Sequence, residues 1–252
     1  MKSVKNIGIV FIILITLVLC ILSSLVFGAR HIDFKNIIDI LFNLDNDSFE
    51  TIVVKERIPR TVFSILAGGS LGIAGTLMQS VTRNPIADPS ILGINTGASL
   101  FVVLGISFLG ITTYRQYIIL ALLGSLLSSI AVYIIASIGS GGISPMKLAL
   151  SGVIISAVFS SLINMIMLPR SEVMSSFRFW QVGSVSGVTW ESIIVMLPFI
   201  IIGIILSFIV APALNALALG DEVAIGLGVK VGLTRVIRSI SAILLCGTVT
   251  AL

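Results

Sequence analysis

Apolar residues dominate this chain in long runs that short polar segments separate. A helix needs about 20 apolar residues to cross a bilayer core of about 30 Å. Six runs approach or exceed that length, near residues 7–27, 61–81, 91–109, 117–138, 147–168 and 192–210. A seventh run begins after Arg238, but residues 239–252 are too few to cross unaided. The pattern predicts an all-α, polytopic membrane helical bundle with six complete spans and a partial seventh.

Composition indicates the same class of protein. The chain is 57% hydrophobic and 10% charged, whereas a soluble domain is about 25% charged, and its mean hydropathy is +1.19. We therefore expect residues 1–252 to form one integral membrane domain. The net charge of +4 comes from few groups and gives no reason to expect a nucleic-acid partner. Cys20 and Cys246 lie far apart in apolar runs, so we expect no metal site and no cofactor.

The predicted spans lack the groups that drive transport by themselves. Between their ends the sequence has no Asp, Glu, Lys, Arg or His apart from Lys147 at one boundary. Proton- and ion-coupled carriers generally need such groups inside the membrane, so ion coupling is disfavoured. The GxxxxGK[ST] phosphate loop is also missing from the sequence. We therefore expect no enzyme activity in this chain and expect a separate partner to supply energy.

The polar side chains inside the spans are uncharged. Gln79 and Asn95 could line a wide, weakly interacting passage, or they could hydrogen-bond between neighbouring helices. Gly68 and Gly72 stand four residues apart in the second span, a spacing that lets two helices approach closely. The spacing predicts a packing face at these glycines.

Two connecting segments carry turn signals. In RNPIADPSILGINTGAS, residues 83–99, Asn84-Pro85 and Asp88-Pro89 predict a tight turn between two helices. In residues 211–235, Gly220 ends one helical pattern, and Asp221 and Glu222 open a second short helix. This second segment is either a docking surface for a soluble partner that supplies mechanical work or an ordinary helix that lies on the membrane.

The segment KERIPR, residues 55–60, gathers basic residues at the start of the second span. Pro59 is expected to break the backbone there and to fix Arg57 and Arg60 near the membrane surface. Two interpretations stay open, because the arginines could contact an acidic partner or simply anchor the helix at the interface.

Three motifs together resemble those of the FecCD family of ABC transporter permeases. They are ERIPR, GTLMQSVTRNPIADPSILGINTGA and LGDEVAIGLGVKV, in this order and spacing. The resemblance extends from the first span to the last residue. It implies a membrane subunit of an importer for iron–siderophore complexes, haem or cobalamin. Permeases of that family have ten helices, so the resemblance implies that this chain lacks roughly the last three helices and part of the seventh.

The resemblance also implies roles for individual residues. Arg57 and Arg60 match arginines that pair with glutamates of an extracytoplasmic substrate-binding protein. Asn84 and Ile86 match an inner gate, and Ser144 matches its second layer more weakly. The residues that match the coupling helices, which contact the cytoplasmic ATPase dimer, are Leu219, Gly220, Asp221, Glu222, Val223, Ala224 and Gly228. With Gln79 and Asn95 on the translocation path, they complete the candidate site.

The resemblance implies an iron–siderophore permease that works by alternating access in the bacterial inner membrane, with a cytoplasmic N-terminus. A second permease subunit, identical or related, would complete the transporter. Haem and cobalamin permeases share the same motifs. A truncated membrane scaffold that does not transport is a further alternative, and a secondary carrier is opposed by the lack of ionisable groups in the predicted spans.

Overall fold

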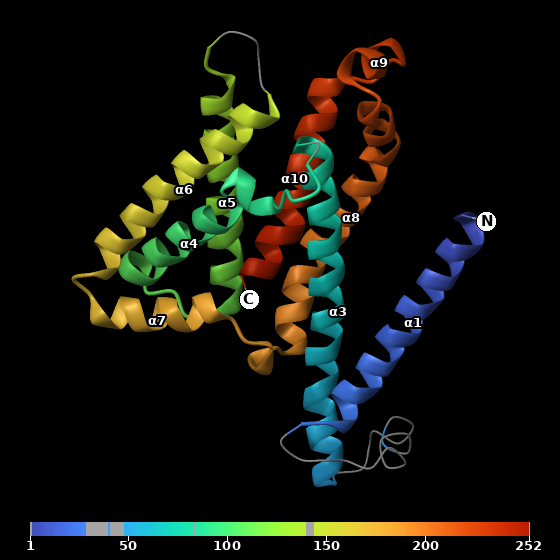
Figure 1. Ribbon diagram of the computed structural model, residues 1–252. Helices are drawn as coiled ribbons and strands as arrows, with labels where there is room; N and C mark the ends of the chain where they lie inside the picture. Colours follow the sequence, from blue (N-terminus) through green and yellow to red (C-terminus); the bar gives the residue numbers. More distant parts are fainter. Residues whose placement is uncertain (1, 29–39, 41–47, 83, 140–143, 252) are drawn as a thin grey trace. The chain divides into compact units, whose positions relative to one another are not determined.

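A computed structural model describes residues 2–28, 40, 48–82, 84–139 and 144–251, and these residues fold almost entirely as helices (Figure 1). The elements are α1 (Lys2–Val26), α3 (Phe49–Thr82), η1 (Pro89–Leu92), α4 (Ile94–Leu104), η2 (Gly105–Leu109), α5 (Tyr114–Ser137), α6 (Pro145–Met167), α7 (Ser171–Val182), η3 (Val185–Gly187), α8 (Trp190–Ala218), α9 (Asp221–Gly226) and α10 (Val231–Thr250). The predicted all-α membrane fold is confirmed. Arg83 lies outside the described residues.

Six helices of the described part of the chain are long and apolar enough to cross a membrane: α1, α3, α5, α6, α8 and α10. The third predicted span is shorter in the structure, because α4 and η2 together cover Ile94–Leu109. The seventh is longer than predicted, since α10 begins at Val231, eight positions before Ser239. α10 therefore contains Arg238, which is only 3% exposed. The prediction that the spans hold no ionisable group is wrong at this position.

One proline lies inside a helix that the sequence predicts to break there. α3 begins at Phe49, so Pro59 occupies an interior position rather than the first turn. α8 also continues through Pro198 and Pro212 to Ala218, eight positions beyond residue 210, where the sequence predicts the sixth span to end. A proline removes one backbone hydrogen bond, and membrane helices tolerate this loss where local adjustments satisfy the freed carbonyl.

The chain divides into two compact units. The first comprises Met1–Ile65 with Val185–Trp190, and the second comprises Leu66–Ser184 with Glu191–Leu252. In the first unit, a small hydrophobic cluster of Leu25, Ile40 and Val54 joins the end of α1 to α3. The hydroxyls of Ser24 and Thr61 are 2.9 Å apart and share a hydrogen bond between the same two helices.

The second unit is organised around α4, which packs on both α5 and α6, while α10 packs on α5 and α4 (Figure 1). α5 and α4 cross at two glycines. A Cβ atom added at Gly124 would collide with the carbonyl oxygen of Gly97, and one added at Gly97 would collide with that of Gly124. Only hydrogen at both positions lets the two backbones touch.

Serine hydroxyls of α5 satisfy the backbone at the start of α4. Ser125 donates to the carbonyl of Ile94 over 3.1 Å, Ser128 to that of Gly93 over 2.8 Å, and Ser129 to that of Leu92 over 3.3 Å. Gly93 has a φ of 66°, which joins η1 to α4 through a left-handed residue. These bonds hold an irregular stretch of backbone inside the bundle, where its carbonyls would otherwise lose hydrogen bonds to water.

The packing face that the sequence predicts at Gly68 and Gly72 is not used within the described residues. Both glycines are exposed, and an added Cβ would meet no atom within 4 Å. Close helix contacts lie instead at Gly97, Gly124, Gly152 and Gly203, where an added Cβ would strike a neighbouring helix. The spacing of glycines shows where a close approach is possible, and tertiary packing selects which sites are used.

We expect Gly124→Ala to destabilise the fold by about 1–3 kcal/mol, because overpacking a tight contact forces the backbones apart. Gly72→Ala is the matched control and should change stability by less than about 1 kcal/mol, since its Cβ enters open space and alanine favours a helix. Thermal unfolding of the purified chain in detergent measures both. Equal unfolding temperatures for the two variants would contradict the role of the crossing.

Candidate functional site

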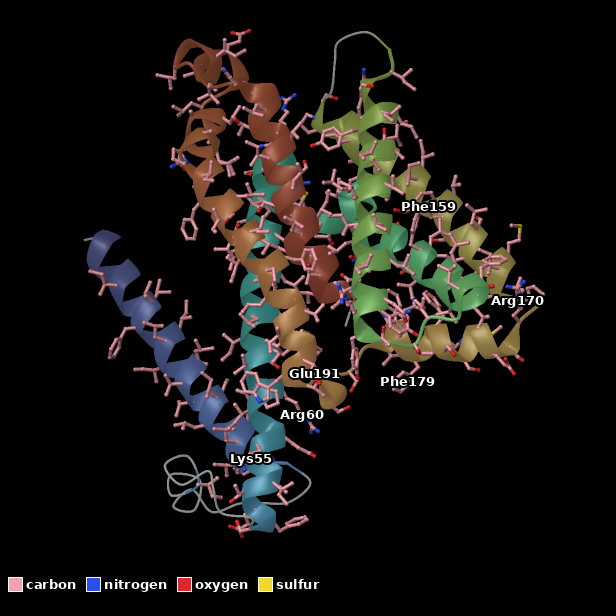
Figure 2. All side chains as sticks on the ribbon, turned by 180° about the vertical axis from the view of Figure 1, so that it is seen from behind. Lys55, Arg60, Phe159, Arg170, Phe179 and Glu191 are labelled. Atoms are coloured by element: carbon pink, nitrogen blue, oxygen red, sulfur yellow. The ribbon has the colours of Figure 1, made fainter. Side chains whose placement is uncertain are left out.

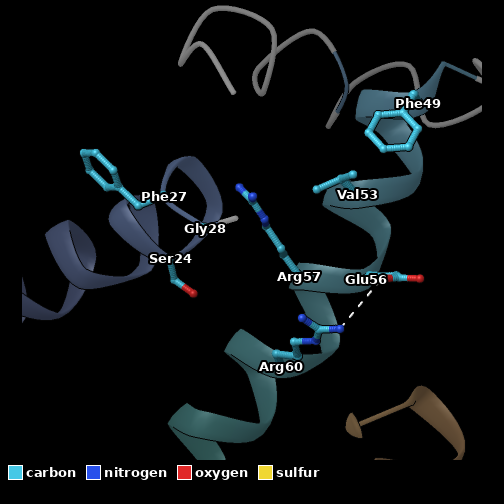
Figure 3. Close-up of a pocket in the computed structure, with 8 residues that line it drawn as sticks. All are labelled: Ser24, Phe27, Gly28, Phe49, Val53, Glu56, Arg57 and Arg60. Carbon is cyan, nitrogen blue, oxygen red and sulfur yellow. Dashed lines mark ion pairs between the residues drawn. The ribbon is translucent and has the colours of Figure 1, made fainter. Parts of the chain in front are cut away.

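The two arginines in the basic segment of α3 differ in burial: Arg57 is buried and Arg60 is partly exposed. The Arg57 side chain is 8% exposed and turns toward α1 (Figure 3). Its Nη1 donates to the carbonyl of Leu25 over 2.5 Å and to that of Val26 over 3.2 Å. Gly28 leaves room for this guanidinium, since an added Cβ would lie 2.5 Å from Arg57 Nη2. Arg57 therefore caps the C-terminal end of α1.

Arg60 lies one turn further along α3 and is more exposed. Its Nη2 is 3.6 Å from Glu56 Oε2, in an ion pair whose side chains are 38% and 68% exposed (Figure 3). Its Nε is shielded from solvent and has no hydrogen-bond partner among the described residues. Arg60 thus keeps donors that this ion pair does not use, because a guanidinium carries five N–H groups.

Two cavities of the first unit meet at Arg60 and Glu56. A cavity of about 440 Å³ between α1 and α3 is lined by Ser24, Phe27, Gly28, Phe49, Val53, Glu56, Arg57 and Arg60 (Figure 3). A second cavity, of about 370 Å³, is lined by Lys55, Glu56, Pro59, Arg60, Ser186, Gly187, Val188, Thr189 and Trp190. Lys55 and Arg60 are labelled along α3 in Figure 2.

The wall of the second cavity that Trp190 and the η3 turn form was not predicted from the sequence. Trp190 and the η3 turn lie about 130 positions after Arg60 in the sequence, and no local pattern connects the two segments. Trp190 is 50% exposed at the first residue of α8. The sequence signal for this cavity is limited to the residue types, a tryptophan and two basic residues. That signal becomes informative only once the fold brings the three residues together.

The predicted turn after α3 forms as expected. Asn84 Oδ1 accepts a hydrogen bond from the Ile86 amide over 3.0 Å, and Asp88 Oδ1 accepts one from the Ser90 amide over 2.7 Å. Asp88 is the N-cap of η1, with Pro89 at its first position. Ile86 is 87% exposed at the tip of this turn. The turn therefore fixes a large apolar side chain in an open position, which suits a contact that forms in another conformation or with a partner.

The other predicted path residues lie on separate elements. Asn95, at the start of α4, accepts a hydrogen bond from Thr250 Oγ1 over 3.3 Å and a longer one from Cys246 Sγ over 3.6 Å. Gln79 is exposed near the end of α3. Ser144 is the N-cap of α6 and accepts from the Lys147 amide over 3.3 Å. The structure thus connects Asn95 to α10 and gives Ser144 a role in starting a helix.

The segment after α8 forms the short helix that the sequence predicts. Gly220 has a φ of 120°, which places the N-cap of α9 in a region open to glycine alone. α9 ends at Gly226, and Gly228 has a φ of 82°. Glu222 is exposed in the first turn. The side chain of Asp221 lies outside the described residues.

The α9 segment exposes most of its apolar side chains and buries one residue, Ala224. Leu219, Val223, Ile225 and Leu227 are 69%, 47%, 62% and 64% exposed, whereas Ala224 is fully buried. The Val229 amide also donates to the Ala224 carbonyl over 2.9 Å and closes the loop on itself. A small helix with a fixed backbone and an open apolar surface is suited to fit a groove on a partner.

A family model described as the FecCD transport family matches residues 15–252 of this chain. The ferric enterobactin transport system permease protein FepD of Escherichia coli (strain K12) is 36% identical over 241 residues, which are 95% of this chain and 72% of the relative. The Fe(3+)-citrate import system permease protein YfmD of Bacillus subtilis (strain 168) is 38% identical over 224 residues, or 89% of this chain and 66% of the relative.

The hemin transport system permease protein HmuU of Yersinia pestis is 30% identical over 245 residues, which are 95% of this chain and 72% of the relative. A solved inward-facing ABC transporter, assigned to the metal-chelate type, superposes with a TM-score of 0.76 at 23% identity. It covers 96% of this chain and 74% of its own. That likeness establishes the fold. The chain therefore spans between two thirds and three quarters of the length of most of these proteins.

We expect Asp88→Ala to loosen the turn between α3 and α4, because losing an N-cap acceptor costs about 1 kcal/mol. Hydrogen exchange of the amides in residues 88–93 should become roughly fivefold faster. Asp88→Asn keeps a side-chain acceptor for the Ser90 amide and should exchange like the parent chain. If the alanine and asparagine variants exchange alike, the Asp88 cap does not hold this turn.

Proposed function

We propose, because this chain belongs to the FecCD transport family, that it is the membrane-spanning permease subunit of a binding-protein-dependent ABC importer for ferric–siderophore complexes. The relatives carry the names of iron-chelate and haem permeases, and the helical fold matches an ABC transporter. The chain performs no covalent chemistry in this proposal. It converts ATP hydrolysis by a separate ATPase dimer into alternating access.

The α9 segment is the observation that carries this proposal. Its exposed apolar side chains, Leu219, Val223, Ile225 and Leu227, form a surface of the kind that a partner's groove covers. Gly220 is the N-cap of α9, the helix contains Asp221, Glu222 and Ala224, and Gly228 lies in the loop that follows it with a φ of 82°. Ala224 is buried and the loop closes on its own backbone. A displacement of α9 would therefore also displace the residues that pack against Ala224.

The length of α8 suits a helix that crosses a membrane. Its 29 residues extend about 43 Å at 1.5 Å per residue, which is enough to cross a bilayer. Ala218 at its end leads into α9. In this proposal an acidic binding protein contacts the arginine segment from outside the cell membrane, and the ATPase dimer contacts α9 from the cytoplasm.

The order of the helices gives the orientation within this proposal. If α9 is cytoplasmic, α8 runs inward and each earlier span alternates in direction, provided that α4 with η2 also crosses. The N-terminus is then cytoplasmic, in the inner membrane of a bacterium. Asn84, Ile86 and Ser144 fall on the cytoplasmic side as gate residues, while Gln79 and Asn95 lie on the path. A second permease subunit would supply the other wall of that path.

Uptake of radiolabelled ferric siderophores by cells with and without this gene tests the proposed cargo. Loss of ferric-siderophore uptake upon deletion, restored by the gene in trans, is the supporting result. The similarity to a hemin permease makes haem the second candidate. Loss of haem uptake alone would show that the cargo is haem and would leave the assignment as an importer intact. Unchanged uptake of every chelate would favour a scaffold that does not transport.

We expect Gly220→Val to uncouple ATP hydrolysis from uptake. A β-branched side chain at a φ of 120° is strained, and a strain of about 1–3 kcal/mol lowers the population of the correct α9 start by roughly 5- to 150-fold. Uptake should fall by a factor in that range. The variant should still insert into the membrane, and the ATPase subunits should still hydrolyse ATP.

Gly226→Ala is the matched control for this variant. Its backbone lies within α9 and an added Cβ meets no atom within 4 Å, so uptake should stay close to that of the parent. Uptake and ATPase activity are measured together in proteoliposomes of the assembled importer. Parent-like transport by Gly220→Val would count against α9 as the coupling element.

A further inference from the structure

The last turn of α10 meets the first turn of α4 through side-chain hydrogen bonds. Asn95 Oδ1 accepts from Thr250 Oγ1 over 3.3 Å and from Cys246 Sγ over 3.6 Å. Thr250 and Cys246 are four positions apart, so they share one face of α10. The Thr250 hydroxyl also lies 2.9 Å from the Cys246 carbonyl and shares its proton between two acceptors. Asn95 is therefore a direct link between α4 and α10.

A second contact supports the same junction. Ser125 of α5 donates to the carbonyl of Ile94, the residue before Asn95, over 3.1 Å. Gly247 of α10 lies against this serine, because an added Cβ would be 3.1 Å from Ser125 Oγ. α10 thus meets both the side chain of Asn95 and the serine that holds the neighbouring carbonyl.

α10 begins where the α9 segment ends. α9 contacts α10, and the Val229 amide, two positions before the first residue of α10, donates to the carbonyl of Ala224 over 2.9 Å. The 20 residues of α10 include no proline, so the helix is continuous over about 30 Å. α10 therefore runs from the α9 segment to the start of α4 (Figure 1).

The turn that carries Ile86 is attached to the same start of α4. η1 joins α4 through the single residue Gly93. The Gly93 amide donates to the Ser90 carbonyl over 2.7 Å, and the Ser90 amide donates to Asp88 Oδ1 over 2.7 Å. The connection from Ile86 to Asn95 is thus short and hydrogen-bonded, and a shift of α4 would carry Ile86 with it.

We propose that Asn95 is a positioning residue, whose link to Thr250 makes the start of α4 and the Ile86 turn follow α10 when α9 is displaced. This deepens the proposed function and rests on it. The alternative is that Asn95 acts by contacting the cargo. The two interpretations differ in one respect: a positioning residue depends on Thr250, whereas a cargo contact does not.

Two substitutions and their combination separate these interpretations. Asn95→Leu and Thr250→Val should each lower the amount of chelate transported per ATP hydrolysed by about 2- to 30-fold, the range for residues that carry coupling between sites. The double variant should lose no more than the larger single loss, because both substitutions remove one contact. Uptake and ATP hydrolysis are measured together in proteoliposomes of the assembled importer.

Thr248→Val is the matched control. It makes the same substitution on the same helix, but its hydroxyl bonds the carbonyl of Leu244 within α10 rather than α4. Transport per ATP should therefore stay close to that of the parent.

Hydrogen exchange of the chain alone in detergent tests the link without any partner. The amides of residues 94–98 should exchange about threefold faster in Asn95→Leu and in Thr250→Val, the factor that corresponds to one hydrogen bond between membrane helices. Thr248→Val should leave their exchange unchanged. Parent-like exchange in Thr250→Val would overturn the link between α4 and α10.

The transport data decide the mechanical role. Parent-like transport per ATP in Thr250→Val, or single losses that multiply in the double variant, would overturn the proposal. A loss in Asn95→Leu alone that differs among chelates would make Asn95 a cargo contact instead. If the assembled parent transports no chelate, the proposed function and the mechanical role both fail, while hydrogen exchange still decides whether Asn95 and Thr250 hold the two helices together.

Discussion

Close backbone contact between α4 and α5 is the constraint on which the second unit depends. Gly97 and Gly124 face each other at the crossing, and neither can carry a side chain without moving a helix. In a membrane, helices gain little from burying apolar surface against one another, so contact geometry and hydrogen bonds decide how they associate. The serines of α5 add the hydrogen bonds, since they donate to the carbonyls at the start of α4. This interface allows an irregular junction, η1 to α4, to lie within the bundle.

The candidate site depends on where the fold places a few charged side chains and a few residues of irregular backbone. Arg57 lies against the end of α1, and Arg60 and Lys55 line the cavity beside Trp190. At the end of α8, Gly220 starts a helix whose apolar side chains stay open. In the proposed function, the first of these features contacts the binding protein and the second contacts the ATPase dimer.

Local sequence signals were sufficient where one residue type determines the backbone. Asp88-Pro89 predicts the start of η1, and Gly220 followed by Asp221-Glu222 predicts α9, because capping and positive φ are local properties. The predicted break at Pro59 is wrong. Pro59 lies inside α3, since a membrane helix continues through a proline wherever its surroundings satisfy the freed carbonyl. Arg238 was also misplaced, because α10 begins earlier than its apolar run.

The sequence by itself determined the helical membrane class, the order of the spans, the turns and the family, because hydropathy and turn chemistry act over a few neighbouring residues. Only the tertiary structure decided which glycines touch and which arginine is buried against the end of α1. Gly68 and Gly72 have the right spacing but open surroundings, whereas Gly97 and Gly124 meet across 27 positions of sequence. Arg57 and Arg60 share one motif, yet the end of α1 occupies only the first. Such contacts depend on helices brought together from distant segments, and no local pattern records that geometry.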